Sequence, residues 1–270
     1  MRCEEIKIQA PESGAEAGLF LYLLDNSREL YDGLLRPMVL ICPGGGYEMT
    51  SDREAEGIAL KLMATGCHCA VLRYSVAPHR YPTALLQAAA SIKLIREHAA
   101  EWYIDPERIY IQGSSAGGHL AASLGVFWKQ PFLAGKLLTS PDMLKPNGLI
   151  LSYPVITSGM FAHRGSFENL LGDDPDKQLL EKLSLEKQVT QDTPRTFLWH
   201  TFEDGTVPVE NSLLFAKALR EKGIPVEFHL FEKGPHGLGT ASKLTMSADG
   251  RGVQKECEIW MELLRVWMGM

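Results

Sequence analysis

The chain has 270 residues, of which 45% are hydrophobic and 22% are charged, values close to the averages of soluble globular proteins. This composition argues against a disordered or fibrous chain, and the length suffices for one large α/β domain or two small ones. The formal net charge of −6 disfavours a nucleic-acid-binding protein, which needs a basic face to neutralise phosphates.

Neither a membrane span nor an export signal is expected. No stretch approaches the ~18 apolar residues of a spanning helix, and the start Met1-Arg2-Cys3-Glu4-Glu5 has acids where a signal peptide carries an apolar run. The five cysteines lie scattered among apolar neighbours, and no second cysteine–histidine cluster accompanies Cys67-His68-Cys69. We therefore expect free thiols, no metal site and a cytoplasmic location.

Apolar, strand-like runs alternate with amphipathic helical runs along the chain, a pattern typical of a mostly parallel sheet flanked by helices. In chain order we expect a strand at 18–24, a strand at 37–42, a helix at 52–65, a strand at 67–74, a helix at 82–102 with Pro82 in its first turn, a turn at 105–106, a strand at 108–112, a tight turn at 113–118 leading into a helix, strands at 147–152 and 195–201, a helix at 209–222, a strand at 225–231 and a closing helix at 252–267. The predicted fold class is α/β.

Residues 153–194 interrupt this alternation. They contain no clear strand but much polar and helical sequence. A connection of that length is usually functional or has structure of its own. We predict one domain over residues 1–270, with a small helical, cap-like insertion at about 153–194.

The segment Gly113-Ser114-Ser115-Ala116-Gly117 has the pattern G-x-S-x-G between a strand and a helix of small residues. In that context a sharp turn forces its central residue into a strained conformation, and glycines on either side relieve the crowding. Ser115 is thus the candidate nucleophile, presented at the positive end of the following helix. Ser114 is the rival, but it lacks the flanking glycine spacing. A glycine-rich turn without chemistry is the other interpretation.

Three consecutive glycines follow the strand 37–42, in Pro43-Gly44-Gly45-Gly46-Tyr47. Their N–H groups can approach a ligand closely and stabilise the negative oxygen of a tetrahedral intermediate. The N–H of Ala116, directly after the nucleophile, is the expected second donor. A phosphate-binding loop is disfavoured because no Gly-Lys-Ser or Gly-Lys-Thr follows, and a plain flexible turn stays open.

A serine nucleophile needs an imidazole to take its proton, and that imidazole needs an acid to orient it. His236 lies in Gly234-Pro235-His236-Gly237, just after the last expected strand, and is the candidate base. Asp204, in the loop after the strand 195–201, is the candidate acid, with Glu203 as the alternative. The order serine, aspartate, histidine is that of an α/β-hydrolase fold.

Three other histidines compete with His236 for the role of base. His200 ends one expected strand and His229 lies inside another, so we interpret both as structural. His119 follows the nucleophile turn into its helix and is expected to point away from Ser115.

With these motifs the chain resembles the α/β-hydrolase superfamily, in particular its esterase/lipase branch, from residue 37 to the last helix. Pro43 stands where the hormone-sensitive-lipase-like members carry histidine, and in this it is more similar to acetylesterases and acetylxylan-esterase-like proteins. The resemblance implies an α/β-hydrolase fold with an oxyanion hole formed by Gly45, Gly46 and Ala116.

The expected function is that of a serine carboxylesterase that hydrolyses short-chain acyl esters, with acetyl as the expected acyl group and sugars among the candidate alcohols. No cofactor and no metal are expected. The expected partner is a small-molecule ester, such as an acetylated carbohydrate, not nucleic acid or membrane, and a homo-oligomer is compatible with the sequence. Aromatic residues able to stack on a sugar, or to lie in the core, are Tyr47, Tyr74, Tyr81 and Trp128. The alternatives are a serine peptidase of the prolyl-oligopeptidase type and a non-catalytic binding protein on the same fold.

Overall fold

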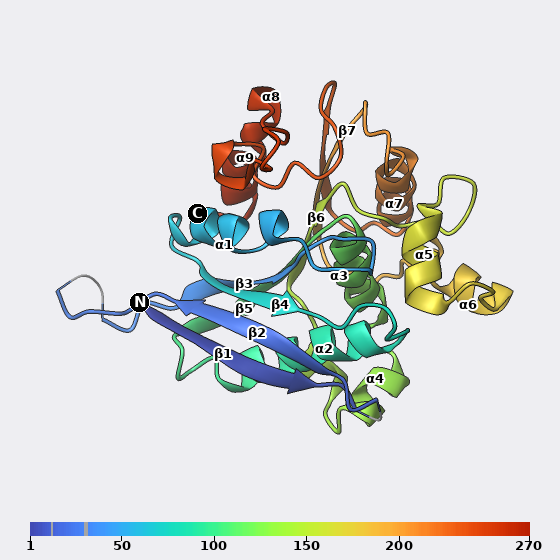
Figure 1. Ribbon diagram of the computed structural model, residues 1–270. Helices are drawn as coiled ribbons and strands as arrows, with labels where there is room; N and C mark the ends of the chain where they lie inside the picture. Colours follow the sequence, from blue (N-terminus) through green and yellow to red (C-terminus); the bar gives the residue numbers. More distant parts are fainter. Residues whose placement is uncertain (12, 30–31) are drawn as a thin grey trace.

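A mixed β-sheet runs through the protein, whose computed structural model describes residues 1–11, 13–29 and 32–270 (Figure 1). Its strands are β1 (Arg2–Gln9), β2 (Glu16–Leu23), β3 (Arg36–Cys42), β4 (His68–Arg73), β5 (Ile104–Ser114), β6 (Gly148–Ser152), β7 (Thr196–Thr201) and β8 (Val226–Phe231). Within the described residues they form one sheet in the order β1-β2-β4-β3-β5-β6-β7-β8. The β1–β2 and β2–β4 pairs are antiparallel, and every other pair is parallel.

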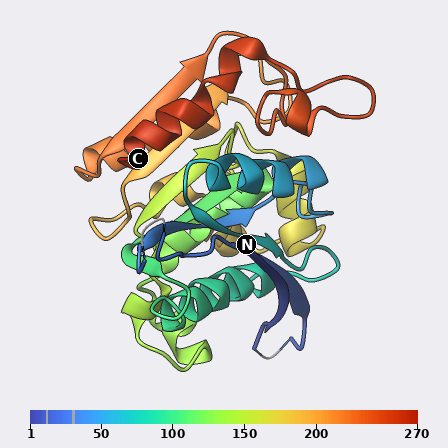
Figure 2. The same cartoon turned by 90° about the vertical axis from the view of Figure 1, so that its left-hand side faces the viewer.

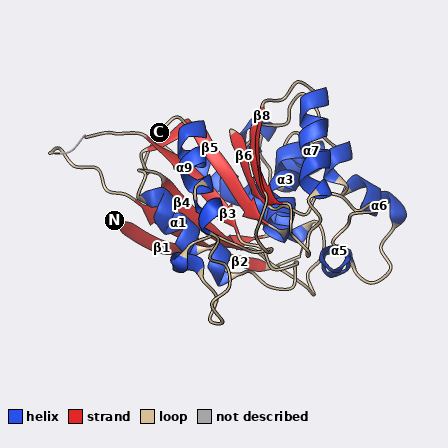
Figure 3. Ribbon diagram, turned by 90° about the horizontal axis from the view of Figure 1, so that it is seen from above, coloured by secondary structure: helices blue, strands red, loops and turns tan. Residues whose placement is uncertain are grey.

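Helices cover both faces of this sheet (Figure 3). The α-helices are α1 (Glu56–Met63), α2 (Thr83–Glu97), α3 (Ala116–Phe127), α4 (Pro131–Lys136), α5 (Arg164–Leu171), α6 (Lys177–Lys182), α7 (Glu210–Glu221), α8 (Lys255–Glu258) and α9 (Trp260–Trp267), and the 3-10 helices are η1 (Asp52–Glu54), η2 (Pro141–Leu144), η3 (Leu185–Lys187) and η4 (Lys243–Thr245). Buried side chains of α2, α3 and α7 join one apolar cluster, and those of α1, α8 and α9 join a second. Figure 2 shows the C-terminal helices (red) beside the last strand (orange), with α2 (teal) on the other side of the sheet. The expected α/β fold, a mostly parallel sheet flanked by helices, is confirmed.

The central strands explain why the candidate site forms at one edge of the sheet. In β3, Met38 and Leu40 pack into the first cluster and Val39 and Ile41 into the second, so both faces are buried and the strand is continuously apolar. The parallel register places Cys42 of β3 beside Gly113 of β5. The glycine loop after β3 and the turn after β5 therefore leave the sheet side by side.

Two strands differ from expectation. No element is expected over residues 2–9, but β1 pairs with β2 along its whole length. Because β1 is an edge strand in which only Ile8 is buried, its apolar alternation is weak. The turn expected at Asp105-Pro106 is wrong as well, since β5 begins at Ile104 and contains both residues.

Two expected helices are each divided into shorter ones, and a third is shorter than expected. The helix expected at 52–65 forms as η1 and α1, separated by Ala55 with φ −114° and ψ −106°. The closing helix expected at 252–267 forms as α8 and α9, and Val253 and Ile259 are exposed. The helix expected to reach residue 102 ends at Glu97, and Pro82 caps it instead of lying in its first turn.

Residues 153–194 contain α5, α6 and η3 and no strand among the described residues. In Figures 1 and 3, α5 and α6 lie together beside α7. A cap-like role for this insertion stays a prediction. In the part of the chain described, no helix combines the length and the apolarity that crossing a membrane requires.

Candidate active site

Ser115 lies in a strained turn between β5 and α3. It caps the N-terminus of α3 with φ 55° and ψ −121°, a region that non-glycine residues rarely adopt. Flanking side chains could not fit: a Cβ on Gly113 would lie 2.1 Å from the Gly117 carbonyl oxygen, and one on Gly117 would lie 2.0 Å from the Cys42 carbonyl oxygen. Gly113 is thus required by the close packing within the turn, and Gly117 by the contact between the turn and the end of β3.

His236 lies next to Ser115, although 121 positions separate them in the sequence. Its Nε2 atom is 2.8 Å from the Ser115 hydroxyl oxygen. The loop that carries His236 is tied to β7, because the Thr201 hydroxyl donates to the Gly234 carbonyl at 2.8 Å. The imidazole also packs edge-on against the buried Tyr153 ring, with centroids 5.0 Å apart.

Asp204 completes the cluster on the other side of the imidazole. Its Oδ2 atom lies 2.6 Å from Nδ1 of His236, and its Oδ1 accepts the N–H groups of Thr206 and Val207, both at 2.9 Å. Burial alone would raise the pKa of Asp204, but hydrogen bonds with His200 and His236 outweigh it and hold this pKa well below its usual range. The aspartate is therefore ionised at neutral pH.

This arrangement selects the imidazole tautomer of His236. Because Nδ1 faces an ionised carboxylate, it carries the proton and donates to Asp204, which leaves Nε2 to accept the hydrogen of the Ser115 hydroxyl. The structure thus brings the three candidate residues into one hydrogen-bonded chain. The alternative acid, Glu203, is exposed and makes no hydrogen bond with His236. The alternative nucleophile, Ser114, is buried and accepts from the Gln112 amide at 3.1 Å.

His200 contacts the same carboxylate, which the sequence interpretation missed. Its Nε2 lies 3.1 Å from Asp204 Oδ2 and 3.0 Å from the Val207 carbonyl oxygen, and its Nδ1 lies 2.7 Å from the Ser212 hydroxyl. A structural role was expected for this residue, and the spacing of four positions to Asp204 was the available signal. The rings of the other two histidines bond other residues: His119 bonds Tyr47 and Leu183, and His229 bonds Glu227.

The glycine loop lies beside Ser115 with two amides free to bind a ligand. Gly45 and Gly46 have φ values of 129° and 64°, which favour glycine, and their N–H groups donate to no acceptor among the described residues. Ala116 is the first residue of α3, so its N–H has no acceptor within the helix. The Asn169 side-chain amide, from α5, donates to the Gly46 carbonyl at 3.0 Å and anchors the loop.

Glu54 is a second residue that the sequence interpretation missed. This carboxylate is buried, with 4% of the residue exposed. It accepts the Gly44 N–H at 2.9 Å and the Tyr153 hydroxyl at 2.7 Å, and that hydroxyl in turn accepts the Gly239 N–H at 2.8 Å. Glu54 therefore links the glycine loop to the loop that carries His236.

Ser115 and His236 open into a pocket of about 250 Å³. Its other lining residues are Gly45, Gly46, Met49, Ser51, Arg53, Glu54, His163, Thr206 and Gly237. His163 comes from the insertion, and its Nδ1 lies 2.8 Å from the Ser166 hydroxyl. Burial, and next the nearby His236, lower the pKa of His163. The aromatic residues considered for sugar stacking do not line this pocket, and Tyr47, Tyr74 and Trp128 are buried in the core.

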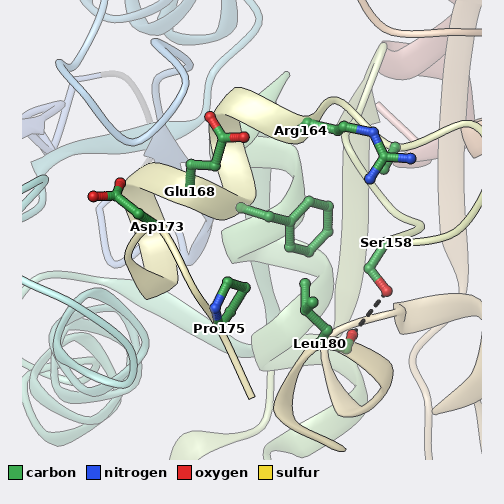
Figure 4. Close-up of a pocket in the computed structure, with 8 residues that line it drawn as sticks. Ser158, Arg164, Glu168, Asp173, Pro175 and Leu180 are labelled. Atoms are coloured by element: carbon green, nitrogen blue, oxygen red, sulfur yellow. Dashed lines mark hydrogen bonds between the residues drawn. The ribbon is translucent and has the colours of Figure 1, made fainter. Parts of the chain in front are cut away.

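A second cavity, of about 220 Å³, lies within the insertion and shares no lining residue with the first. Arg164 borders it on one side and Glu168 and Asp173 on the other (Figure 4). The Ser158 hydroxyl, also at its wall, donates to the Leu180 carbonyl at 2.8 Å. Neither cavity holds a metal-binding cluster, since the described residues contain no group of three or more histidine, cysteine, aspartate or glutamate side chains placed to bind an ion.

Comparison with known proteins adds three observations. A family model described as α/β hydrolase fold matches residues 39–240. The chain is 40% identical over 231 residues to endo-1,4-β-xylanase B of Butyrivibrio fibrisolvens, covering 83% of this chain and 35% of that protein. It is 30% identical over 205 residues to an acetylxylan esterase of Xylanibacter ruminicola, covering 73% of this chain and 40% of that protein. The alignments thus span two fifths or less of these two curated relatives.

A solved structure is similar over almost the whole chain. It is the acetyl ester-xyloside bifunctional hydrolase from Caldicellulosiruptor lactoaceticus, with a TM-score of 0.84 and 36% sequence identity. The superposition covers 99% of this chain and 96% of that one. The likeness therefore extends beyond the sheet to the flanking helices and the insertion.

Proposed function

The chain belongs to the α/β-hydrolase fold family, and on that premise we propose that it is a serine carboxylesterase that forms an acyl-enzyme on Ser115. The observation that carries this proposal is the hydrogen-bonded chain from Ser115 through His236 to Asp204, at 2.8 and 2.6 Å. We further propose that residues 1–270 act as one domain and that 153–194 form a cap over the site.

In the first half of the reaction, the Ser115 oxygen attacks the ester carbonyl while His236 Nε2 takes its proton. Asp204 keeps the Nδ1 proton in place and stabilises the imidazolium that forms. The negative oxygen of the tetrahedral intermediate accepts hydrogen bonds from the N–H groups of Gly45, Gly46 and Ala116. The intermediate collapses as His236 returns its proton to the leaving alcohol.

In the second half, water takes the place of the alcohol. His236 removes a proton from the water as it attacks the acyl carbonyl, and the same amides hold the second oxyanion. Ser115 recovers its proton when the carboxylic acid leaves. Every step uses side chains and amides of this chain.

We propose acetyl or another short acyl group as the preferred acyl part, and a sugar as the alcohol. A pocket of about 250 Å³ lies below the range of roughly 300–1,000 Å³ that holds drug-sized ligands, which favours a small ester. The similarity to an acetylxylan esterase and to an acetyl ester-xyloside hydrolase supports the sugar.

Substitution of the nucleophile tests this proposal. Ser115→Ala is expected to lower kcat toward p-nitrophenyl acetate by at least about a thousandfold, because the acyl-enzyme cannot form. Ser114→Ala is the matched control and should keep most of the activity. A fluorophosphonate should label the wild type and Ser114→Ala but not Ser115→Ala. Full activity of Ser115→Ala would refute the proposal.

Assays of the wild-type protein also test the two alternative functions, a serine peptidase and a non-catalytic binding protein. A serine peptidase would cleave a chromogenic aminoacyl-proline amide faster than an acetyl ester, whereas we expect the reverse. A non-catalytic binding protein would react with neither substrate and would leave the fluorophosphonate unreacted.

A further inference from the structure

The pocket beside Ser115 contains a guanidinium group whose two terminal nitrogens have no hydrogen-bond partner among the residues that the structure describes. Arg53 lies in η1, and its Nε donates to the Thr245 carbonyl oxygen at 2.8 Å. Nη2 is buried without a hydrogen-bond acceptor, and among the described residues no acceptor bonds Nη1 and no carboxylate pairs with Arg53. A guanidinium has five donors and a strong preference for oxygen acceptors. Arg53 therefore still has donors available for a ligand.

The backbone holds this guanidinium in one place. A Cβ on Gly252, which has φ 91°, would lie 2.0 Å from Nη2 and 3.2 Å from Cζ of Arg53. The group is thus fixed between the bare backbone of Gly252 and the Thr245 carbonyl. Such a fixed group loses little conformational entropy when it binds a ligand.

Arg53 and Glu54 border the same small space beside His236. A Cβ built on Gly237 would lie 3.9 Å from Arg53 Nη1 and 3.9 Å from Glu54 Oε1. Both residues line the pocket that contains Ser115. Glu54 Oε1 already accepts the Tyr153 hydroxyl, and a carboxylate oxygen has a second lone pair to offer. One hydrogen-bond donor and one acceptor therefore lie next to the base.

We propose that Arg53 and Glu54 form a subsite for the alcohol part of the ester, which binds two neighbouring hydroxyl groups of a sugar. One hydroxyl accepts a hydrogen bond from Arg53 Nη1, and the adjacent hydroxyl donates to Glu54 Oε1. The opposite charges of the two side chains compensate each other, so the subsite suits a neutral polyol better than an alcohol that carries a carboxylate. This inference rests on the proposed function and deepens it by naming the groups that select the alcohol.

Three acetyl esters test the subsite. The first is a mono-O-acetylated methyl xyloside with two free neighbouring hydroxyls, the second is the same compound with those hydroxyls O-methylated, and the third is p-nitrophenyl acetate. The wild type is expected to prefer the first over the second. Arg53→Gln should lower kcat/KM for the free xyloside by about tenfold, the loss expected for one charged hydrogen bond. The change should appear mainly in KM, and the other two substrates should change by less than about twofold.

Arg73→Gln is the matched control, because Arg73 pairs with Asp52 of the same 3-10 helix and does not line the pocket. It should not alter the preference among the three esters. Arg53→Lys keeps the charge but loses the planar fork, and should restore part of the selectivity. Thermal unfolding of each variant verifies that it is folded.

The possible negative results distinguish a failure of the subsite from a failure of the proposed esterase function. If Arg53→Gln loses activity equally on all three esters, or on none, the subsite is overturned. The subsite alone also fails if the wild type hydrolyses p-nitrophenyl acetate but does not distinguish the two xylosides. If the wild type hydrolyses none of the three, the proposed function fails and the subsite with it.

Discussion

His200 donates a second hydrogen bond to Asp204: its Nε2 lies 3.1 Å from Asp204 Oδ2, the oxygen that also faces His236. Nε2 must be the donor, because its other neighbour is the Val207 carbonyl oxygen at 3.0 Å. Nδ1 bonds the Ser212 hydroxyl at 2.7 Å, so both ring nitrogens are held and the imidazole orients the carboxylate. His200 and two backbone amides thus hold Asp204 in place independently of its contact with His236.

His200→Gln should therefore lower kcat toward p-nitrophenyl acetate by about tenfold, since one hydrogen bond to a charged group is lost. KM should change little because His200 does not line the pocket. His229→Gln is the control, because His229 lies on the adjacent strand and its ring bonds Glu227, not Asp204. Equal rates for His200→Gln and the wild type would exclude this positioning role.

Asp204→Asn should reduce kcat by roughly 10⁴-fold, because an amide next to Nδ1 favours the wrong imidazole tautomer. Glu203→Gln, one position away and exposed, should leave kcat within about twofold. Steady-state kinetics on both variants measures the difference. A large loss in Glu203→Gln with little loss in Asp204→Asn would reverse the assignment of the acid.

Gly117→Ala should unfold the nucleophile turn rather than merely slow the reaction. The added Cβ would lie 2.0 Å from the Cys42 carbonyl oxygen, a backbone atom that cannot rotate away. We expect the free energy of unfolding to fall by about 3 kcal/mol. Gly135→Ala, in α4 where a Cβ meets nothing within 4 Å, should raise it by about 0.5–1 kcal/mol. Urea unfolding of both variants tests this; a stable Gly117→Ala protein would show that the turn can open.

The fold class was predictable because the buried strands β3, β4 and β7 each contain an apolar run, at residues 37–42, 69–72 and 197–199. The positions of Ser115, Asp204 and His236 were predictable as a cluster because all three follow parallel strands, whose ends meet at one edge of the sheet. Edge strand β1 was not predictable, since it buries too little apolar surface to show a period.

The supporting residues of the site could not be found by the same reasoning. Glu54 acts through a contact with Tyr153, 99 positions away, and no local motif marks it. His200 lies four positions from Asp204, and that spacing is the one local signal of its role. From the sequence alone, Arg53 is expected on the surface of a helix. Its position in the pocket depends on contacts with Gly252 and Thr245, about 190 to 200 positions later in the chain. These roles depend on tertiary contacts, which a pattern of apolar residues does not specify.

His119 should make the stability of the protein depend on pH. It is buried, its Nε2–H donates to the Leu183 carbonyl at 3.0 Å, and its Nδ1 lies 2.9 Å from the Tyr47 hydroxyl, so the neutral form has a partner at both ring nitrogens. Burial lowers the pKa of His119 from 6.5 to about 4. Between these two pH values the unfolded chain binds a proton that the folded chain does not, so the free energy of unfolding must fall as pH drops from 6.5 to 4.

The lowered pKa of His119 reduces the free energy of unfolding at pH 4 by up to about 3 kcal/mol relative to pH 7. In His119→Gln the pH-dependent fall in stability should be smaller than in the wild type, although the remaining buried His68, whose pKa burial also lowers to about 4, keeps part of it. His79→Gln, at an exposed position, should retain the full fall. Urea unfolding at pH 7.0 and 4.5 measures the fall in the free energy of unfolding for the wild type and for each variant. The same fall in His119→Gln as in the wild type would mean that the buried imidazole accepts a proton without cost.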